Sequence, residues 1–241
     1  MLTTIQVQQL MYEACKSTHS FMVNMRNIGG AGEESLTDKL LSEINERLSD
    51  VFITWKHNKL LEGRKTGADW EWWIIYGSHY FCFHVQAKKF SDSLRDVQSV
   101  FYKSGEQYQL LLNDANKYSA IPLYVYYVAN IGGFNLRCSN YSDSGVYYED
   151  ARNMNRYYSG GKYNNQTGLV LLRHANPLPC LLCNIDPMCN GLGNHIDIIE
   201  TFDVPSYVNY LKDGKDINTV SLPDSERERI SLFNSIVLVR L

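Results

Sequence analysis

Four polar side chains interrupt an aromatic segment at positions where they could share one ligand. The segment is GADWEWWIIYGSHYFCFHVQAKKF, residues 67–90, and the four residues are Asp69, Glu71, Gln86 and Lys88. Side chains alternate between the two faces of a strand, so Asp69 shares a face with Glu71, and Gln86 shares one with Lys88. If the segment folds as a β-hairpin, two acids, an amide and a lysine lie at its open end.

The apolar residues of the segment predict how its two strands pair. A hairpin centred between Ser78 and His79 places Asp69 opposite Lys88, and Glu71 opposite Gln86. The other face is then apolar throughout, as a core-facing side requires. Its pairs are Trp70 with Ala87, Trp72 with Val85, Ile74 with Phe83 and Tyr76 with Phe81. This register collects the four polar groups on one face, with cross-strand neighbours about 4.5–5.5 Å apart at Cβ. The alternative is an exposed hairpin end with surface ion pairs, each worth about 0–1 kcal/mol.

The elements that would position this face have helical and strand patterns. Apolar residues recur at helical spacing in 3–26, 33–48 and 105–119. Strand patterns cover 51–56 and 121–130, on either side of the hairpin. The order from residue 33 is therefore helix, strand, strand, strand, helix, strand. We expect Gln107 and Gln109 to lie on the exposed face of the helix at 105–119.

The second half of the chain has weaker patterns. We predict a loop over 140–167, a strand at 168–175, a short helix at 204–211 and a closing strand at 236–241. No composition shift marks a linker, so residues 1–241 are predicted to form a single domain. Its core would cover 33–130, and 131–241 would be a C-terminal elaboration.

Composition and charge are those of an ordinary globular protein. The chain is 44% hydrophobic and has a net charge of −3, so no global basic field indicates a nucleic-acid binder. No apolar run approaches the ~18 residues that span a bilayer, and the N-terminus lacks the pattern of a signal peptide. Six scattered cysteines do not resemble a secreted disulfide framework. We expect a reduced, cytoplasmic protein without membrane contact.

A cluster of sulfur and imidazole groups offers a second possible chemistry. Cys180, Cys183 and Cys189 are followed by His195, and Cys-x2-Cys is a usable zinc spacing. The remaining pair is more loosely spaced than structural zinc sites require. Leu181 and Leu182 suggest a buried strand, in which cysteine behaves as a small hydrophobe. Buried thiols are therefore favoured over structural Zn²⁺, and His174 is expected to be a structural residue.

The order of elements and the polar residues together resemble the PD-(D/E)XK nucleases. The shared features are an acid in the first helix, an aspartate on one strand and (E/Q)-x-K on the next. Gln86-Ala87-Lys88 is similar to the Q-x-K of the Mrr-like restriction endonuclease branch. The resemblance covers about residues 33–130 and implies an α/β fold with a mixed sheet and a restriction-endonuclease-like αβββαβ core.

The resemblance also implies roles for individual residues. Asp69 matches the metal-binding aspartate, Gln86 the acid-or-amide position and Lys88 the motif lysine. Glu34 matches the acid of the first helix, with Glu33 as its rival because only the helix phase separates them. The implied metal ligands are Asp69, Glu34 and Gln86. Glu71 is not required by the family, but the register places it beside the site, which makes it a further catalytic candidate.

The implied activity is hydrolysis of phosphodiester bonds with Mg²⁺ or Mn²⁺ as cofactor. DNA is the expected substrate in preference to RNA, and a restriction or antiviral role is typical of such nucleases. Activity could involve a homodimer or a partner protein. Nucleic-acid contacts are expected from a basic segment whose residues are Lys56, Lys59, Arg64 and Lys65. Two alternatives stay open, namely a weakened nuclease fold that only binds nucleic acid or protein, and a zinc-stabilised interaction domain.

Overall fold

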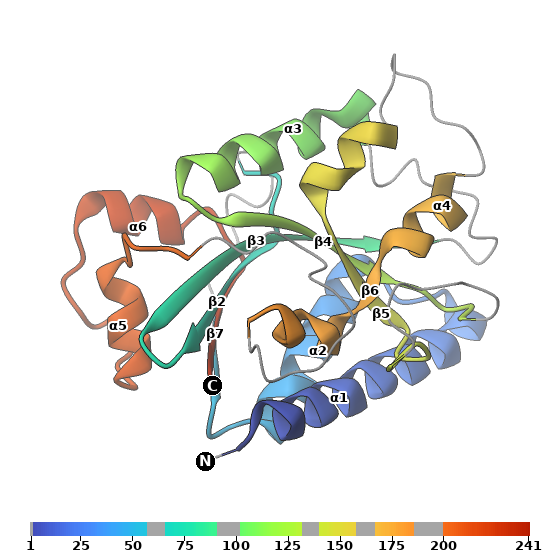
Figure 1. Cartoon of the computed structure of the whole chain (residues 1–241), viewed down its shortest axis with the longest axis horizontal. Coiled ribbons are helices and arrows are strands. Elements are labelled where there is room, and N and C mark those ends of the chain that lie inside the picture. The colour runs from blue at the N-terminus through green and yellow to red at the C-terminus, as the bar shows by residue number, and fades with distance from the viewer. Residues whose placement is uncertain (1, 57–65, 91–101, 132–139, 158–166, 186–199) are drawn as a thin grey trace.

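A mixed sheet forms the centre of the protein, seen in a computed structural model that describes residues 2–56, 66–90, 102–131, 140–157, 167–185 and 200–241 (Figure 1). Within those stretches the sheet has seven strands in the order β1-β7-β2-β3-β4-β5-β6. The strands are β1 (Phe52–Lys56), β2 (Trp70–Tyr76), β3 (His79–Lys89), β4 (Ile121–Tyr127), β5 (Val146–Asp150), β6 (Asn176–Pro177) and β7 (Ser235–Arg240). This arrangement confirms the mixed α/β fold class.

Helices cover both faces of the sheet. The α-helices are α1 (Thr4–Met25), α2 (Glu33–Arg47), α3 (Tyr102–Lys117), α4 (Thr167–His174), α5 (Ser206–Lys212) and α6 (Asp224–Ile230). Three short 3-10 helices are η1 (Arg26–Ile28), η2 (Ala151–Tyr157) and η3 (Leu178–Asn184). In Figure 1, α1 and α2 lie on one side of the sheet and α3 lies on the other. From residue 33 the order α2, β1, β2, β3, α3, β4 is the predicted one.

Strict alternation along β2 divides its tryptophans between two cores. Trp70 and Trp72 pack with the apolar stripes of α1 and α2. Trp73 and Ile75 face the opposite way and pack with Tyr207 of α5 and Ile230 of α6. Glu71, His84, Gln86 and Lys88 belong to this second face because they alternate with the apolar residues of the first. These four side chains are buried, so each of their polar groups needs a partner.

The last strand of the chain lies in the middle of the sheet. β7 runs parallel to β2 and antiparallel to β1, and it separates the two. Residues at the C-terminal end therefore share one sheet with the predicted core. The closing strand and the short helix at 204–211 are confirmed as β7 and α5.

The predicted hairpin register is wrong by two residues. Asp69 precedes a strand in which Trp70 pairs with Val85, and Glu71 pairs with His84 instead of Gln86. The turn is the two-residue loop Gly77–Ser78, in which Gly77 has φ +58°, a conformation that glycine adopts without strain. A shift of two residues preserves which face each side chain occupies. The face assignment is therefore right, whereas the opposite partners are not.

Three expectations for the second half are also wrong. The predicted loop at 140–167 contains β5 and η2, and the predicted strand at 168–175 is the helix α4. Short apolar runs do not distinguish a strand from a buried helix, and Arg173 and His174 in the last turn suit the negative end of a helix dipole. Leu181 and Leu182 are buried, as expected, but in η3 and not in a strand.

Candidate active site at one end of the sheet

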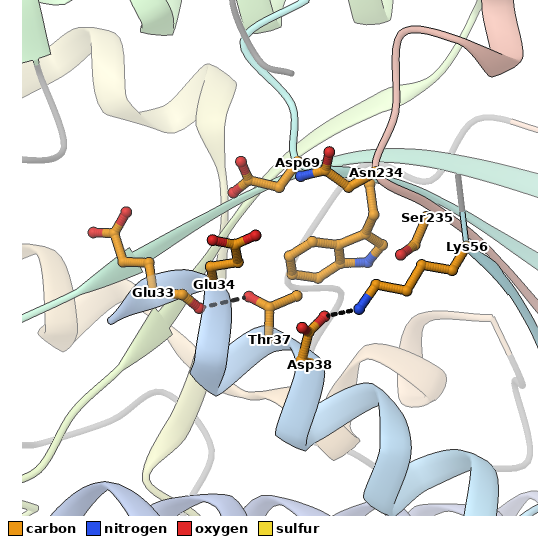
Figure 2. A pocket seen from close by; sticks show the side chains of 9 residues that line it. Glu33, Glu34, Thr37, Asp38, Lys56, Asp69, Asn234 and Ser235 are labelled. Carbon is orange, nitrogen blue, oxygen red and sulfur yellow. Dashed lines mark hydrogen bonds and ion pairs between the residues drawn. The ribbon is translucent and has the colours of Figure 1, made fainter. Parts of the chain in front are cut away.

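A pocket of about 140 Å³ opens where α2 meets the ends of three strands (Figure 2). We call it the acidic pocket, and its lining residues are Glu33, Glu34, Thr37, Asp38, Lys56, Asp69, Trp70, Asn234 and Ser235. Four of them are acids, and one is a lysine. Three of those acids are on the first two turns of α2, and the fourth lies immediately before β2. This excess of carboxylates favours a cation as the occupant.

The first turn of α2 brings both predicted glutamates into the acidic pocket. Glu33 and Glu34 occupy the positive end of the helix dipole, which stabilises their charges. Glu33 Oε1 accepts a hydrogen bond of 3.0 Å from the Lys89 backbone, and Glu33 Oε2 lies 3.8 Å from Lys88 Nζ. The side chain of Glu34 projects into the same pocket (Figure 2). Helix phase therefore excludes neither glutamate as a metal ligand, because both side chains reach the acidic pocket.

Asp69 is held directly against the Q-x-K segment of β3. Its Oδ2 accepts hydrogen bonds from the Ala87 backbone at 2.7 Å and from Gln86 Nε2 at 2.6 Å. Its backbone N–H continues the ladder by donating to the Val85 carbonyl at 2.7 Å. Asp69 and Gln86 thus lie directly opposite each other on one face. The two bonds to Oδ2 orient the Asp69 side chain at the wall of the pocket.

A chain of hydrogen bonds leads from Lys88 through two glutamines to Asp69. Lys88 Nζ donates to Gln107 Oε1 at 2.9 Å, and Gln107 Nε2 donates to Gln86 Oε1 at 2.7 Å. Gln86 Nε2 then donates to Asp69 Oδ2. Because the lysine can only donate and the carboxylate only accept, the orientation of both amides is fixed. We call these four residues the polar relay.

Gln107 is the one relay residue that the sequence pattern did not place at the site. It was expected on an exposed helix face, but it is half-buried and bonded to two motif residues, whereas Gln109 is exposed as expected. Gly67 allows this close approach. A Cβ at Gly67, whose φ is +70°, would lie 2.3 Å from the Gln107 carbonyl oxygen and 2.6 Å from the Leu111 nitrogen. The signal in the sequence was a glycine two residues before Asp69.

The two neighbouring glutamines of α3 give a matched test of the relay. We expect Gln107→Ala to lower the activity proposed below by about 10–100-fold, since Lys88 and Gln86 lose the partner that orients them. Gln109→Ala should change it by less than about twofold, because the exposed side chain contacts no relay residue. Initial rates under identical metal and substrate concentrations provide the measurement. Equal rates for the two variants would show that the relay has no role in positioning.

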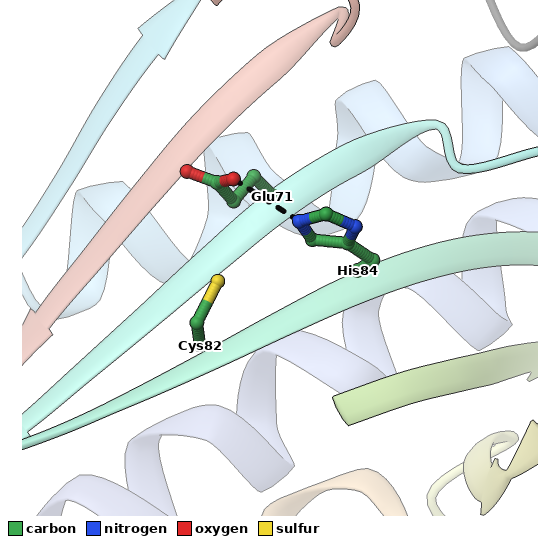
Figure 3. A group of neighbouring side chains, drawn as sticks. All are labelled: Glu71, Cys82 and His84. Carbon is green, nitrogen blue, oxygen red and sulfur yellow. Dashed lines mark hydrogen bonds and ion pairs between the residues drawn. The ribbon is translucent and has the colours of Figure 1, made fainter. Parts of the chain in front are cut away.

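Glu71 does not join the acidic pocket but lies in a separate buried network with His84 and Cys82 (Figure 3). Arg229 of α6 donates to Glu71 Oε2 at 2.9 Å and 2.7 Å, and His84 Nε2 lies 3.2 Å from the same oxygen. Tyr207 and Trp73 donate to the other oxygen, Oε1. The prediction that four hairpin residues form one site therefore fails for Glu71, whose two oxygens are occupied by other side chains.

Charge pairing stabilises the ionised form of this buried carboxylate. Burial alone would raise the pKa of Glu71, but the charge of Arg229 and the contact with His84 lower it to about 2. Oxygen, sulfur and nitrogen atoms of Glu71, Cys82 and His84 lie within 4.8 Å of one another, a spacing that a metal ion could use. Arg229 already supplies the positive charge that pairs with Glu71 there, and it occupies Oε2, which a metal ion would otherwise use.

His84 makes the network sensitive to pH. Burial would lower the pKa of His84, but Asp114 at 2.8 Å and Glu71 on the other side raise it above its ordinary value. A raised folded-state pKa stabilises the protein below the unfolded pKa of about 6.5, and this stabilisation is lost as pH rises through the folded value. Urea unfolding of the wild type should therefore show stability falling above pH ~6.5. If the free energy of unfolding falls with pH in the same way in His84→Gln, His84 is not the group responsible.

The remaining predicted residues are dispersed or lie outside the described stretches. Lys56 lines the acidic pocket and donates to Asp38 Oδ1 at 2.7 Å, whereas Lys59, Arg64 and Lys65 are outside the described residues. Cys180 is buried, and Cys183 Sγ lies 2.9 Å from Gln8 Nε2. Cys189 and His195, the other possible zinc ligands, are also outside. In the described parts of the chain, no helix is long and apolar enough to cross a membrane.

Comparison with known proteins adds one finding. A protein-family model matches residues 7–227, and its description reads "Family of unknown function (DUF6615)". The match covers α2, the hairpin, α3 and most of the C-terminal half. No curated protein matches the chain.

Proposed function

The chain belongs to DUF6615, whose function is unknown, and from the geometry of its site we propose that it is a metal-dependent nuclease that hydrolyses phosphodiester bonds in DNA. One observation carries this proposal. Helix, strand and hairpin elements that are distant in sequence bring carboxylates, an amide and a lysine to one end of the sheet. The resemblance of D-x(n)-Q-x-K to the PD-(D/E)XK nucleases supports the same activity. A cytoplasmic location and a role in restriction or antiviral defence remain predictions.

The donor atoms of the acidic pocket suit Mg²⁺ or Mn²⁺. These ions prefer oxygen ligands and are commonly held by one or two carboxylates together with water. Asp69 and either Glu33 or Glu34 would supply those carboxylates from opposite walls of the pocket. When bound there, the ion would polarise a phosphodiester and lower the pKa of a coordinated water.

The protein's own residues would orient the reacting groups. Lys88 carries a positive charge on a side chain that is buried and anchored by Gln107, so its ammonium group has little freedom to move. It would hold the attacking water or stabilise negative charge that develops on the phosphoryl oxygens. Glu33, at 3.8 Å from Lys88 Nζ, keeps that charge balanced before the substrate enters.

Gln86 occupies the position at which a carboxylate is more common in the resembling family. Its Nε2 points at Asp69, and its Oε1 accepts from Gln107. Ligation of a metal by Gln86, as the resemblance implies, would require the amide to leave these hydrogen bonds. In the observed arrangement Gln86 orients Asp69 instead, which leaves the acids of α2 to complete the ligand set.

Metal-dependent cleavage by the wild-type protein tests the proposal. We expect plasmid and single-stranded DNA to be cut with Mn²⁺ or Mg²⁺, and cleavage to stop when EDTA is added. An RNA substrate in parallel tests the preference for DNA. If Mn²⁺ binds in a calorimetric titration but no substrate is cut, the alternative of a binding module with a weakened site is favoured. Absence of both binding and cleavage would reject the nuclease proposal.

A further inference from the structure

A second pocket, of about 190 Å³, continues from the acidic pocket along α2. We call it the adjoining pocket, and its lining residues are Asp38, Leu41, Ser42, Asn45, Thr54, Lys56 and Ser235. Asp38, Lys56 and Ser235 line both pockets. The two therefore form one groove between α2 on one side and the ends of β1 and β7 on the other.

One stripe of α2 forms a wall of this groove. Glu34, Asp38, Ser42 and Asn45 are spaced by four, four and three residues, which places them on a single face of a helix. Eleven residues separate the first from the last, so the stripe is about 16 Å long at a rise of 1.5 Å per residue. A wall of this length can follow a short stretch of one nucleic-acid backbone.

The character of the groove changes along this stripe. The acidic end has four carboxylates and one lysine, whereas the adjoining pocket has one carboxylate balanced by one lysine. The other polar groups of the adjoining pocket are hydroxyls and an amide. Thr54 Oγ1 is buried there and has no hydrogen-bond partner among the described residues. A cation suits the first part, and a neutral or anionic group that forms hydrogen bonds suits the second.

Lys56 stands between the two parts of the groove. Its Nζ lies 2.7 Å from Asp38 Oδ1, with the two side chains about half exposed at 54% and 48%. Exposed ion pairs of this kind contribute only about 0–1 kcal/mol, so an incoming phosphate can replace Asp38 at little cost. The lysine could then bind the phosphate next to the one at the metal site.

From this geometry we propose that a DNA strand lies along α2 in the groove, with its backbone entering the adjoining pocket and Lys56 exchanging Asp38 for the phosphate that flanks the cleaved one. The inference rests on the proposed nuclease function and specifies how that site would bind its substrate. Ser42 and Asn45, which are exposed, would donate hydrogen bonds to sugar and phosphate oxygens. Such contacts position a strand without reading its sequence.

Binding of a fluorescent single-stranded 15-mer DNA to the Asp69→Asn protein tests this assignment separately from cleavage. Lys56→Ala should weaken the affinity by about 3–10-fold and reduce the salt dependence by about 0.7 in the log–log slope, the value for one phosphate contact. Asp38→Asn, which frees Lys56, should strengthen binding. Ser42→Asp, which adds a negative charge to the adjoining pocket, should weaken it.

The chain offers matched controls for these variants. Lys16 and Asp143 form a similar exposed pair at 3.0 Å, and Ser20 is exposed on α1, all outside the groove. Lys16→Ala and Ser20→Asp change charge by the same amounts and should leave affinity within about twofold. Equal effects of Lys56→Ala and Lys16→Ala, or no binding of the 15-mer by the parent, would overturn the groove assignment. Cleavage by the wild type that is unaffected by Lys56→Ala would overturn it while the nuclease function stands.

Discussion

Replacing Asp69 by asparagine should abolish metal-dependent cleavage while the protein stays folded. Asparagine has the same shape as aspartate, and its oxygen can still accept the hydrogen bond from the Ala87 backbone. The negative charge that faces the cation is lost, however, and a hard divalent ion depends on that charge. We expect a decrease in cleavage rate of at least about a thousandfold, or ~4 kcal/mol in the activation barrier. Asp69→Ala is a poorer test, since it would also leave the Ala87 N–H without its acceptor.

Lys88→Met provides an independent variant on the other side of the site. It keeps most of the side-chain volume and removes the ammonium group that bonds to Gln107. Lys89→Met is the matched control, because the adjacent side chain points away from the relay and donates to the Ala31 carbonyl instead. We expect a loss of at least about a hundredfold for Lys88→Met and a few-fold at most for Lys89→Met.

Product formation is measured under single-turnover conditions, with Mn²⁺ binding measured in parallel. Together they distinguish the metal-binding role of Asp69 from the charge-stabilising role of Lys88. Asp69→Asn should lose metal affinity as well as activity, whereas Lys88→Met should retain the metal and lose activity. Circular dichroism and the midpoint of urea unfolding verify that each variant is folded. Cleavage at the wild-type rate by both variants would show that this end of the sheet is not the catalytic centre.

The faces of the hairpin could be predicted from the sequence, but its register could not. Alternating aromatic residues exclude a slip by one residue, since that would place polar side chains of one strand opposite apolar side chains of the other. A slip by two residues keeps every side chain on its own face, so the apolar pattern does not exclude it. The turn decides between the two registers, and Gly77 at positive φ places the two-residue loop at Gly77–Ser78. Asp69 and Gln86 still meet because their face does not change.

Contacts between distant segments explain the other differences. The relay position of Gln107 depends on how closely α3 packs on Gly67, and no local pattern gives that distance. Asp38 lies one helical turn after Glu34, so helical spacing alone could have placed both acids on the same face of α2. β7 enters the sheet between β1 and β2, and this placement brings Asn234 and Ser235 into the acidic pocket. A strand pattern alone does not indicate which neighbours the strand will have.

The network around Glu71 is another product of long-range packing. From the sequence, Glu71 belongs with Asp69 because the two lie two positions apart on the predicted strand. Its partners Tyr207 and Arg229 come from α5 and α6, more than 130 residues later. In a buried site a carboxylate must be paired, and the guanidinium of Arg229 provides both charge and two donors. Glu71 therefore has a structural role in joining the C-terminal helices to the hairpin.

Arg229→Ala should cause the largest loss of stability, about 3–5 kcal/mol in the free energy of unfolding at pH 7, because it leaves a buried carboxylate without its charged partner. Arg229 is 6% exposed, and its guanidinium also stacks 4.3 Å from the ring centre of Tyr118. Arg227, two residues earlier on α6, is exposed, so Arg227→Ala should cost less than about 1 kcal/mol. Urea unfolding followed by circular dichroism provides both values.

A second substitution separates lost charge pairing from lost packing at Arg229. In Arg229→Met most of the volume remains, so adding Glu71→Gln should recover at least about half of the lost stability by removing the unpaired charge. The pH dependence gives a further check. With its folded pKa lowered to about 2, ionised Glu71 stabilises the wild type above pH ~4.3, and this contribution disappears as pH falls toward 2. The difference between wild type and Arg229→Met should therefore shrink on acidification. A difference that is constant with pH, and no recovery in the double variant, would assign Arg229 a packing role alone.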